Sequence, residues 1–285
     1  MKIKIAISPK TKIGVIGLGN LAQALLSGVL KKQVLRPQQI LAVKHRPEKD
    51  RDLKKKYRIT FVDDIQDICR QADVILLAVK PQQMKDVLVL IRPYYRGQPI
   101  ITVAAGLKVR FYQRYLGKTA PVIRVMPNTA AAIGLGAGAF FASKSVAKSE
   151  KELCLSFFGA TGFIEEVPNE KLIDAVIAVS GSGLAFVYKY TLSVIEGGIK
   201  MGLKPNTARE LALKTLIGAA EMLRQTGREP EELIRQVTSK KGTTLAGLAV
   251  LEKKGFARLI QTAMAKTAHR AKEISEELER NTCRL

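Results

Sequence analysis

The chain has 285 residues, of which 47% are hydrophobic and 25% charged, so it is not disordered and is long enough for about two domains. Lys and Arg outnumber Asp and Glu by 47 to 25, a net charge of +22. The basic residues are dispersed among acidic ones, and Trp is absent, so we do not expect nucleic-acid binding. Three cysteines and two histidines provide neither a disulfide framework nor metal-ligand spacing, so no metal is expected.

Targeting signals are weak. The first residues, MKIKIAISPKTK, lack the long apolar core and small-residue cleavage site of a signal peptide. The longest uncharged apolar stretch, residues 175–188, is 14 residues long, whereas a membrane-spanning helix needs about 20. We therefore expect a cytoplasmic protein with no membrane partner.

The first half of the chain alternates between strand and helix patterns. Strands are expected at residues 13–16, 40–43, 74–79, 99–104 and 122–126. A helix is expected after the first strand and another at residues 63–70. The run at 74–79 is apolar throughout, which is typical of a strand buried on both faces of a sheet. This alternation predicts an α/β domain with a doubly wound, mainly parallel sheet.

From about residue 171 only helical periodicity remains. Helices are expected at residues 179–201, 207–224, 230–236 and 245–279, with breaks at Gly202, Gly227, residues 239–242 and Gly255. The sequence therefore predicts an α/β domain at residues 1–165 and an all-α domain at residues 166–285.

A glycine-rich turn follows the first strand. Residues 17–22, GLGNLA, have the form GxGxxA, in which the first glycine permits a tight turn. The second lets a pyrophosphate approach the N–H groups of a helix N-terminus. Such a turn also occurs in ordinary packing, but its place between a strand and an amphipathic helix favours a Rossmann-type dinucleotide-binding domain.

The second strand ends in Lys44-His45-Arg46, without the acidic residue that holds the ribose hydroxyls of NAD. Lys and Arg can instead bind a 2′-phosphate. A solvated basic turn is the alternative. The pattern favours NADPH, with NADH left open.

Several motifs, in order along nearly the whole chain, resemble the pyrroline-5-carboxylate reductase family. They are IGVIGLGNLA at residues 13–22, ADVILLAVKPQ at 72–82, RVMPNT at 124–129, IDA at 173–175, SGSG at 180–183, MGL at 201–203, VTS at 237–239 and GTTLAGL at 242–248.

The resemblance implies an oxidoreductase that reduces the cyclic imine 1-pyrroline-5-carboxylate to L-proline, the last step of proline biosynthesis, with NADPH or NADH. It also implies a homodimer built through the helical domain, with a decamer as a larger assembly. The implied cofactor-binding residues are Ile16, Gly17, Leu18, Gly19, Asn20, Leu21, Lys44, Arg46, Val79, Lys80, Pro81, Ala104 and Ala105. The implied substrate-binding residues are Glu170, Gln236, Ser239, Gly242, Thr243 and Thr244, and the hydroxyl of Thr244 is the catalytic group at the ring nitrogen.

The residues suit this chemistry. Imine reduction mainly requires two partners to be positioned and a hydrogen-bonding group at nitrogen. A loop rich in glycine and hydroxyl residues, such as residues 238–244, can bind a carboxylate through backbone N–H groups. An ordinary helix start capped by Thr243 or Thr244 is the alternative.

The chain departs from the family pattern near the expected site. Lys240 and Lys241 stand where the family usually has Pro and Gly. Ala130 and Leu184 replace prolines, and Ile65 lies near a position where many relatives have Asn. Losing the glycine matters if that position needs a positive φ. Three alternatives therefore stay open: a related imine or β-hydroxyacid reductase, a catalytically impaired cofactor-binding paralogue, and a nucleic-acid binder suggested only by the net charge.

Overall fold

The structure is a computed structural model that describes residues 7–43 and 47–282. The chain forms two compact units: Met1–Gly181 with Thr267–Leu285, and Ser182–Lys266. The predicted division after residue 165 stays a prediction.

The first unit is built on an eight-stranded sheet with the strand order β3-β2-β1-β4-β5-β6-β7-β8. The strands are β1 (Ile13–Ile16), β2 (Ile40–Val43), β3 (Thr60–Val62), β4 (Val74–Leu77), β5 (Ile100–Thr102), β6 (Val122–Met126), β7 (Gly136–Ala142) and β8 (Gly162–Glu166). All neighbours are parallel except β6 and β7. The prediction of a doubly wound, mainly parallel sheet is confirmed.

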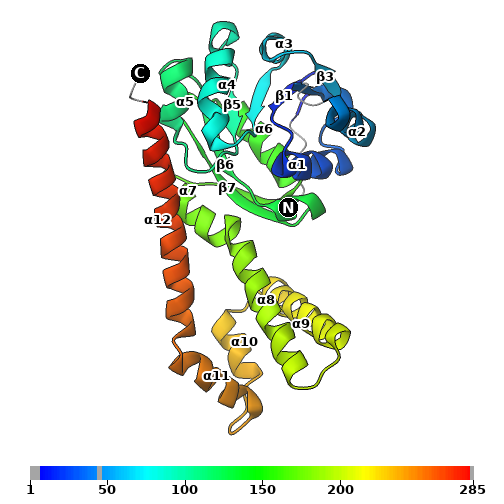
Figure 1. The fold of residues 1–285 in the computed structure, drawn as a ribbon, viewed down its shortest axis with the longest axis vertical. Coiled ribbons are helices and arrows are strands. Elements are labelled where there is room, and N and C mark those ends of the chain that lie inside the picture. The colour runs from blue at the N-terminus through cyan, green and yellow to red at the C-terminus, as the bar shows by residue number, and fades with distance from the viewer. Residues whose placement is uncertain (1–6, 44–46, 283–285) are drawn as a thin grey trace. The chain divides into compact units, whose positions relative to one another are not determined.

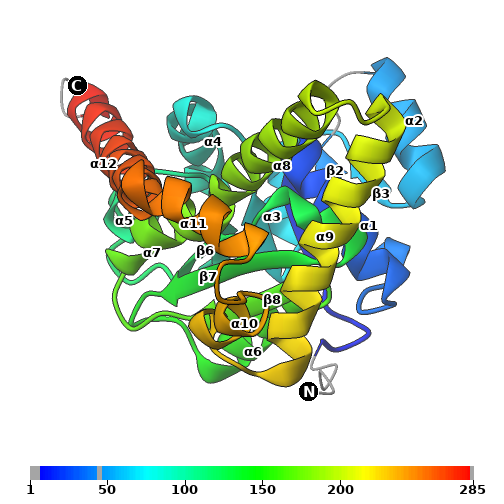
Figure 2. The same ribbon diagram turned by 90° about the horizontal axis from the view of Figure 1, so that it is seen from below.

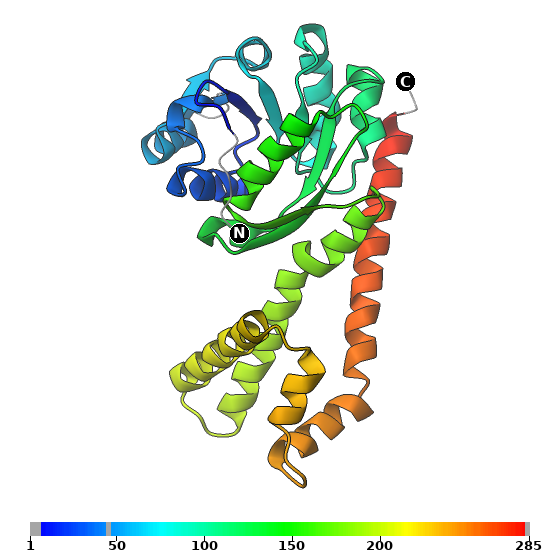
Figure 3. The same cartoon turned by 180° about the vertical axis from the view of Figure 1, so that it is seen from behind.

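Helices cover both faces of this sheet (Figure 1; Figure 3). They are α1 (Asn20–Lys31), α2 (Pro47–Tyr57), α3 (Ile65–Gln71), α4 (Met84–Ile91), α5 (Val109–Leu116), α6 (Lys148–Gly159) and α7 (Leu172–Val176). Short 3-10 turns occupy η1 (Pro37–Gln39), η2 (Pro81–Gln83), η3 (Arg92–Tyr94) and η4 (Thr129–Ile133), and η5 (Ile177–Gly181) is a π turn.

The buried strands supply a separate apolar core to each face. Val15 of β1 packs in a core with α1 and α6, whereas its neighbour Ile16 packs in a core with α3, α4 and α5. Successive side chains of a strand point to opposite faces, so a strand covered on both sides must be apolar throughout. This explains why β1 and β4 are continuous apolar runs.

The second unit is helical, as predicted. It contains α8 (Gly183–Lys200), α9 (Pro205–Thr226), α10 (Pro230–Gln236), α11 (Thr243–Lys253) and the first part of α12 (Phe256–Thr282), and Figure 2 shows α8 beside α9. Gly255, with φ of 69°, separates α11 from α12, so the predicted break there is confirmed.

Many large apolar side chains of this unit are exposed in the single chain. Tyr190, Leu211 and Ile217 are each more than half exposed, whereas Thr191, Ala208 and Ala212 are buried. An exposed apolar surface of this kind marks an interaction site.

By length and composition, the helical stretch Leu172–Lys200 could cross a membrane. The sequence pattern predicted no membrane-spanning helix because its uncharged stretch, residues 175–188, is shorter than this helix. One such helix is weak evidence, because buried helices of other proteins pass the same test.

Candidate active site

The glycine turn after β1 brings that strand directly against the end of β4. Gly17 has a φ of 99°, which favours glycine, and a Cβ there would stand 2.8 Å from the backbone carbonyl of Ala78. The Ala78 N–H donates a hydrogen bond of 2.8 Å to the Ile16 carbonyl. Gly17 is therefore required by both backbone conformation and close packing.

Gly19 has a different role. It is the N-cap residue of α1, and, apart from its own atoms and those of its two chain neighbours, no described atom lies within 4 Å of where its Cβ would stand. Packing within the chain therefore does not explain this glycine. Open space before a helix N-terminus, where unpaired backbone N–H groups gather, suits an anion such as a pyrophosphate.

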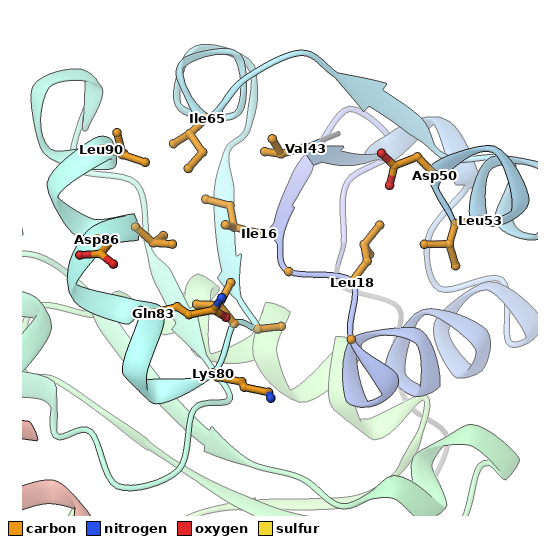
Figure 4. Close-up of a pocket in the computed structure, with 15 residues that line it drawn as sticks. Ile16, Leu18, Val43, Asp50, Leu53, Ile65, Lys80, Gln83, Asp86 and Leu90 are labelled. Atoms are coloured by element: carbon orange, nitrogen blue, oxygen red, sulfur yellow. The ribbon is translucent and has the colours of Figure 1, made fainter. Parts of the chain in front are cut away.

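A cavity of about 680 Å³ opens beside this turn (Figure 4). It is lined by Ile16, Gly17, Leu18, Gly19, Val43, Asp50, Leu53, Ile65, Ala78, Val79, Lys80, Gln83, Asp86, Val87 and Leu90. These residues lie at the carboxyl ends of β1, β2 and β4 and on the neighbouring helices. The strand order reverses between β1 and β4, which is where open α/β sheets bind ligands.

The cavity gathers six of the residues predicted to bind the cofactor: Ile16, Gly17, Leu18, Gly19, Val79 and Lys80. Asn20 and Leu21 continue into α1, and Pro81 begins η2. Ala104 and Ala105 follow β5 and are not part of the cavity lining. Lys44 and Arg46 lie outside the described residues. The cofactor contacts of all these residues remain predictions.

The far wall of the cavity was missed by the sequence interpretation. Gln83, Asp86, Val87 and Leu90 occupy positions i, i+3, i+4 and i+7 along η2 and α4, the pattern that places side chains on one face of a helix. That spacing, directly after β4, was the available signal. Ile65, noted only as a departure, also lines the cavity.

The lining suits a dinucleotide. Ile16, Val43 and Ile65 supply apolar side chains for a planar base (Figure 4). Lys80 supplies positive charge near the turn, and Asp50 and Asp86 supply carboxylates from α2 and α4. With the unfilled space at Gly19, these residues fit a nicotinamide dinucleotide.

The loop after β5 is held by buried hydroxyl groups. The Thr102 Oγ1 accepts a hydrogen bond of 3.3 Å from the Ala104 N–H and lies 2.6 Å from the Tyr112 hydroxyl of α5. Burial raises the pKa of Tyr112 above its usual range, so this hydroxyl stays protonated. The predicted residues Ala104 and Ala105 therefore belong to a firmly anchored loop.

Glu170 makes contacts within the first unit. Its Oε1 accepts a hydrogen bond of 2.7 Å from the Val109 N–H and pairs with Arg124 at 3.4 Å. The predicted substrate contact of Glu170 is not tested by this geometry and stays a prediction.

The remaining predicted substrate residues lie in the second unit. Gln236 ends α10 and is exposed, and Ser239 begins the turn that leads to α11. The Gly242 N–H donates to the Ser239 carbonyl at 3.0 Å, and a Cβ at position 242 would collide with the Ser239 hydroxyl. Gly242 therefore allows the hydroxyl of Ser239 to lie against the start of the helix.

The two lysines of this turn differ in backbone conformation. Lys241 has a φ of 59°, a left-handed conformation that favours glycine. The turn thus adopts the conformation of a glycine although it carries a lysine. Gly242 is the N-cap residue of α11, and Thr243 and Thr244 form its first turn. The alternative in which either threonine is the N-cap is therefore wrong.

Among residues 7–43 and 47–282, no three His, Cys, Asp or Glu side chains are grouped to hold a metal ion. The doubly wound sheet, the glycine turn and the cavity at the reversal of strand order define a dinucleotide-binding protein of the Rossmann class.

Comparisons with known proteins identify the family. Residues 170–274 match the pyrroline-5-carboxylate reductase dimerisation family, and residues 12–106 match the coenzyme F420-dependent NADP oxidoreductase family. The chain is 37% identical over 271 residues to pyrroline-5-carboxylate reductase 2 of Bacillus subtilis, covering 93% of this chain and 96% of the relative. It is 35% identical over 268 residues to the Pseudomonas aeruginosa enzyme, covering 94% and 98%. The chain belongs to the pyrroline-5-carboxylate reductase family.

Solved structures of pyrroline carboxylate reductases also match the fold of this chain. A pyrroline-5-carboxylate reductase of Coxiella burnetii matches with a TM-score of 0.87 at 31% identity, covering 93% of this chain and 99% of the other. The Plasmodium falciparum pyrroline carboxylate reductase, solved with NADP bound, matches with a TM-score of 0.86 at 28% identity, covering 94% and 100%.

Proposed function

We propose that this chain reduces 1-pyrroline-5-carboxylate to L-proline with NADPH. The observation that carries the proposal is similarity to a pyrroline-5-carboxylate reductase over 93% of this chain, joined to a dinucleotide cavity at the reversal of strand order. The activity named for the relatives matches the chemistry expected of these residues.

The cofactor is proposed to occupy the cavity beside the glycine turn. Its pyrophosphate lies at the N-terminus of α1, where Gly19 leaves space, and its 2′-phosphate contacts Lys44 and Arg46. The nicotinamide end is bordered by Val79, Lys80, Pro81, Ala104 and Ala105. When bound, NADPH supplies the hydride.

The substrate carboxylate is proposed to bind the Ser239 hydroxyl and the backbone of Gly242-Thr243 at the start of α11, with the Thr243 N–H as the donor because the Gly242 N–H donates to the Ser239 carbonyl. Thr244 donates a hydrogen bond to the ring nitrogen and orients the C=N bond. The imine carbon, which becomes C5 of proline, gains the hydride, and the ring nitrogen gains a proton from solvent, which yields the secondary amine of proline. Gln236 is proposed to lie beside this cradle.

The lysines of the turn are compatible with this cradle. Lys241 keeps the left-handed conformation that a glycine would adopt, so the backbone N–H groups keep their directions. This observation favours an active reductase over an impaired paralogue.

Assembly follows from the exposed apolar surface of the helical unit and its match to the dimerisation family. We propose a homodimer that can assemble further into a decamer, located in the cytoplasm. Residues 1–165 are proposed to bind the cofactor, and residues 166–285 to provide the substrate cradle and the dimer contact.

The direct test is a turnover assay with purified protein, racemic 1-pyrroline-5-carboxylate and either NADPH or NADH, with proline measured as product. Turnover to proline is expected with NADPH. Tight NADPH binding without turnover would instead support the impaired paralogue, and turnover only of other imines or keto acids would support a different reductase.

A further inference from the structure

Arg124 is a charged residue inside the first unit. Its side chain is 2% exposed, and it projects from β6 between apolar strand neighbours. Burying a guanidinium is costly unless its charge and N–H groups are paired. Arg124 is paired twice, by Nη1 with Glu170 at 3.4 Å and by Nη2 with Asp174 at 3.3 Å.

Glu170, the first partner of Arg124, also binds the start of α5, next to the loop after β5. Glu170 accepts the N–H of Val109, the first residue of α5, from a position 61 residues further along the chain. Lys108, the N-cap residue of α5, provides no side-chain cap among the described residues, so this carboxylate takes over the capping role. It thereby fixes the start of α5.

Helix α5 is in turn hydrogen-bonded to the end of β5. Its Tyr112 hydroxyl lies 2.6 Å from Thr102 Oγ1, which accepts the Ala104 N–H. Gly106, in the same loop, has a φ of 81°, and a Cβ there would stand 3.0 Å from Ile274 of α12. The loop after β5 is thus hydrogen-bonded to Thr102 at its start and packs against α12 at Gly106.

The second partner leads to a different segment. Asp174 lies on α7, which runs directly into the π turn η5 and then into α8. Just beyond β6, Asn128 donates a hydrogen bond of 3.1 Å to the Ser180 carbonyl of that turn, and its Oδ1 accepts the Ala137 N–H at 3.2 Å. Strand β6 and the residues just after it therefore bind the α7–η5 segment at two points, through Arg124 and Asn128. Strand β6 also contacts both α5 and α7 (Figure 1).

We propose that Arg124 is a positioning residue that locks residues 104–109 and residues 172–181 into one arrangement by binding Glu170 and Asp174 together. The inference rests on the proposed function, in which the first segment borders the nicotinamide and the second leads into the substrate-binding helices. It assigns Glu170 a role through α5, and Arg124 touches neither substrate nor cofactor.

The two-pronged shape of the guanidinium is central to this role. Arginine presents several N–H donors in a rigid fork and binds two carboxylates at once, whereas lysine offers a single point charge. Arg124→Lys therefore keeps the buried charge but loses the bond to one of the two carboxylates, Glu170 or Asp174. Lys151→Met is the matched control, because Lys151 pairs with Glu166 at 2.6 Å in the same unit, away from both segments.

The experiment combines hydrogen exchange with kinetics on wild-type, Arg124→Lys, Asp174→Asn and Lys151→Met proteins. In Arg124→Lys, amides of at least one of the two segments should exchange about tenfold faster, the factor expected from losing one charge-assisted hydrogen bond, while β1 and β4 stay protected. The kcat should fall at least tenfold with the KM for NADPH within about twofold, because misplacement affects the reacting geometry. Lys151→Met should match wild type in both measurements.

Unchanged exchange in both segments, or normal kcat in Arg124→Lys, would overturn the inference. If Arg124→Lys does not fold, Asp174→Asn decides: faster exchange at 172–181 with reduced kcat supports the role, and wild-type behaviour refutes it. A wild-type protein that fails to reduce the imine would refute the proposed function instead, and the exchange data would still decide the role of Arg124.

Discussion

Gly17 lies so close to Val79 that a Cβ on Gly17 would stand 2.8 Å from the Val79 backbone nitrogen. The end of β1 and the end of β4 therefore meet backbone to backbone at the floor of the cavity. Gly19, two residues later, meets no such neighbour among the described atoms. One turn thus contains a glycine required by the fold and a glycine whose only evident requirement is a ligand.

Replacing these two glycines should separate stability from cofactor binding. Gly17→Ala places a side chain at a φ of 99° and against backbone atoms, so it should lower the free energy of unfolding by about 2 kcal/mol or more. Gly19→Ala, at a φ of −71°, should change stability by less than about 1 kcal/mol but weaken NADPH binding at least tenfold. Urea unfolding and NADPH fluorescence titration measure the two effects. Full NADPH affinity in Gly19→Ala would place the pyrophosphate elsewhere.

The choice between NADPH and NADH should depend on Arg46. Arg46→Asp replaces a phosphate-binding cation with a repelling carboxylate, so the Kd for NADPH should rise about tenfold or more while that for NADH changes little. Lys144→Asp, an exposed substitution with the same change in net charge, is the control and should leave both Kd values unchanged. An equal loss for both cofactors would remove Arg46 from the 2′-phosphate site.

Thr244 should matter for turnover and not for cofactor binding. Thr244→Val keeps the shape of the side chain but removes the hydroxyl at the ring nitrogen, so kcat should fall about 100-fold while the Kd for NADPH stays within about twofold. Thr244→Ser restores a hydroxyl and should recover much of the rate. An undiminished rate in Thr244→Val would show that this residue only begins α11.

Lys241 should destabilise its own turn. A non-glycine residue in the left-handed region costs about 1–2 kcal/mol, and glycine costs about 0.5–1 kcal/mol in lost chain entropy. Lys241→Gly should therefore raise the free energy of unfolding by about 0.5–1 kcal/mol, measured by urea unfolding at fixed protein concentration. Lys240→Gly is the matched control, because Lys240 does not have a positive φ and gains nothing. Equal effects of the two substitutions would contradict the strain at Lys241.

Cys69 should be inert to alkylation in the folded protein. Burial raises the pKa of the Cys69 thiol to about 11, so little reactive thiolate exists near neutral pH. Because the folded pKa exceeds the unfolded pKa, the buried thiol favours folding below about pH 9 and that contribution is lost as pH rises toward 11. Mass spectrometry after iodoacetamide treatment of a Cys283→Ser variant should show labelling only after urea is added. Rapid labelling of the native protein at neutral pH would refute this.

The stability consequence of Cys69 has its own measurement. Urea midpoints of wild type and Cys69→Ala should differ by a constant amount up to about pH 8, and their difference should shrink in the alkaline range. A difference independent of pH would show that Cys69 titrates normally in the fold.

The sequence predicted the parts of the fold that local patterns determine. The first strand, the glycine turn and its helix are encoded in the 19 consecutive residues 13–31, and β4 is apolar because both its faces are buried. Strands β3, β7 and β8 were not predicted. β3 has three residues, and β7 is rich in glycine and alanine, so neither carries a clear strand pattern.

The site was predictable where it follows a motif and not where it depends on tertiary packing. Leu90 and Val87 line the cavity because α4 packs in the same core as β4; their helical spacing marks one face of α4 but does not specify what that face packs beside. The pairing of Glu170 with Val109 joins residues 61 positions apart and depends on how α7 meets β6. Motif similarity suggested a substrate contact for Glu170, but only the folded geometry revealed its capping of α5.

The most direct test of the central claim is transfer of deuterium from NADPH that carries deuterium in place of both hydrogens at C4 of the nicotinamide. The purified protein is incubated with this cofactor and racemic 1-pyrroline-5-carboxylate, and the product is examined by mass spectrometry and NMR. We predict L-proline carrying one deuterium at C5, the carbon of the reduced imine. Unlabelled proline, or no proline although NADPH is bound, would contradict the proposed reaction.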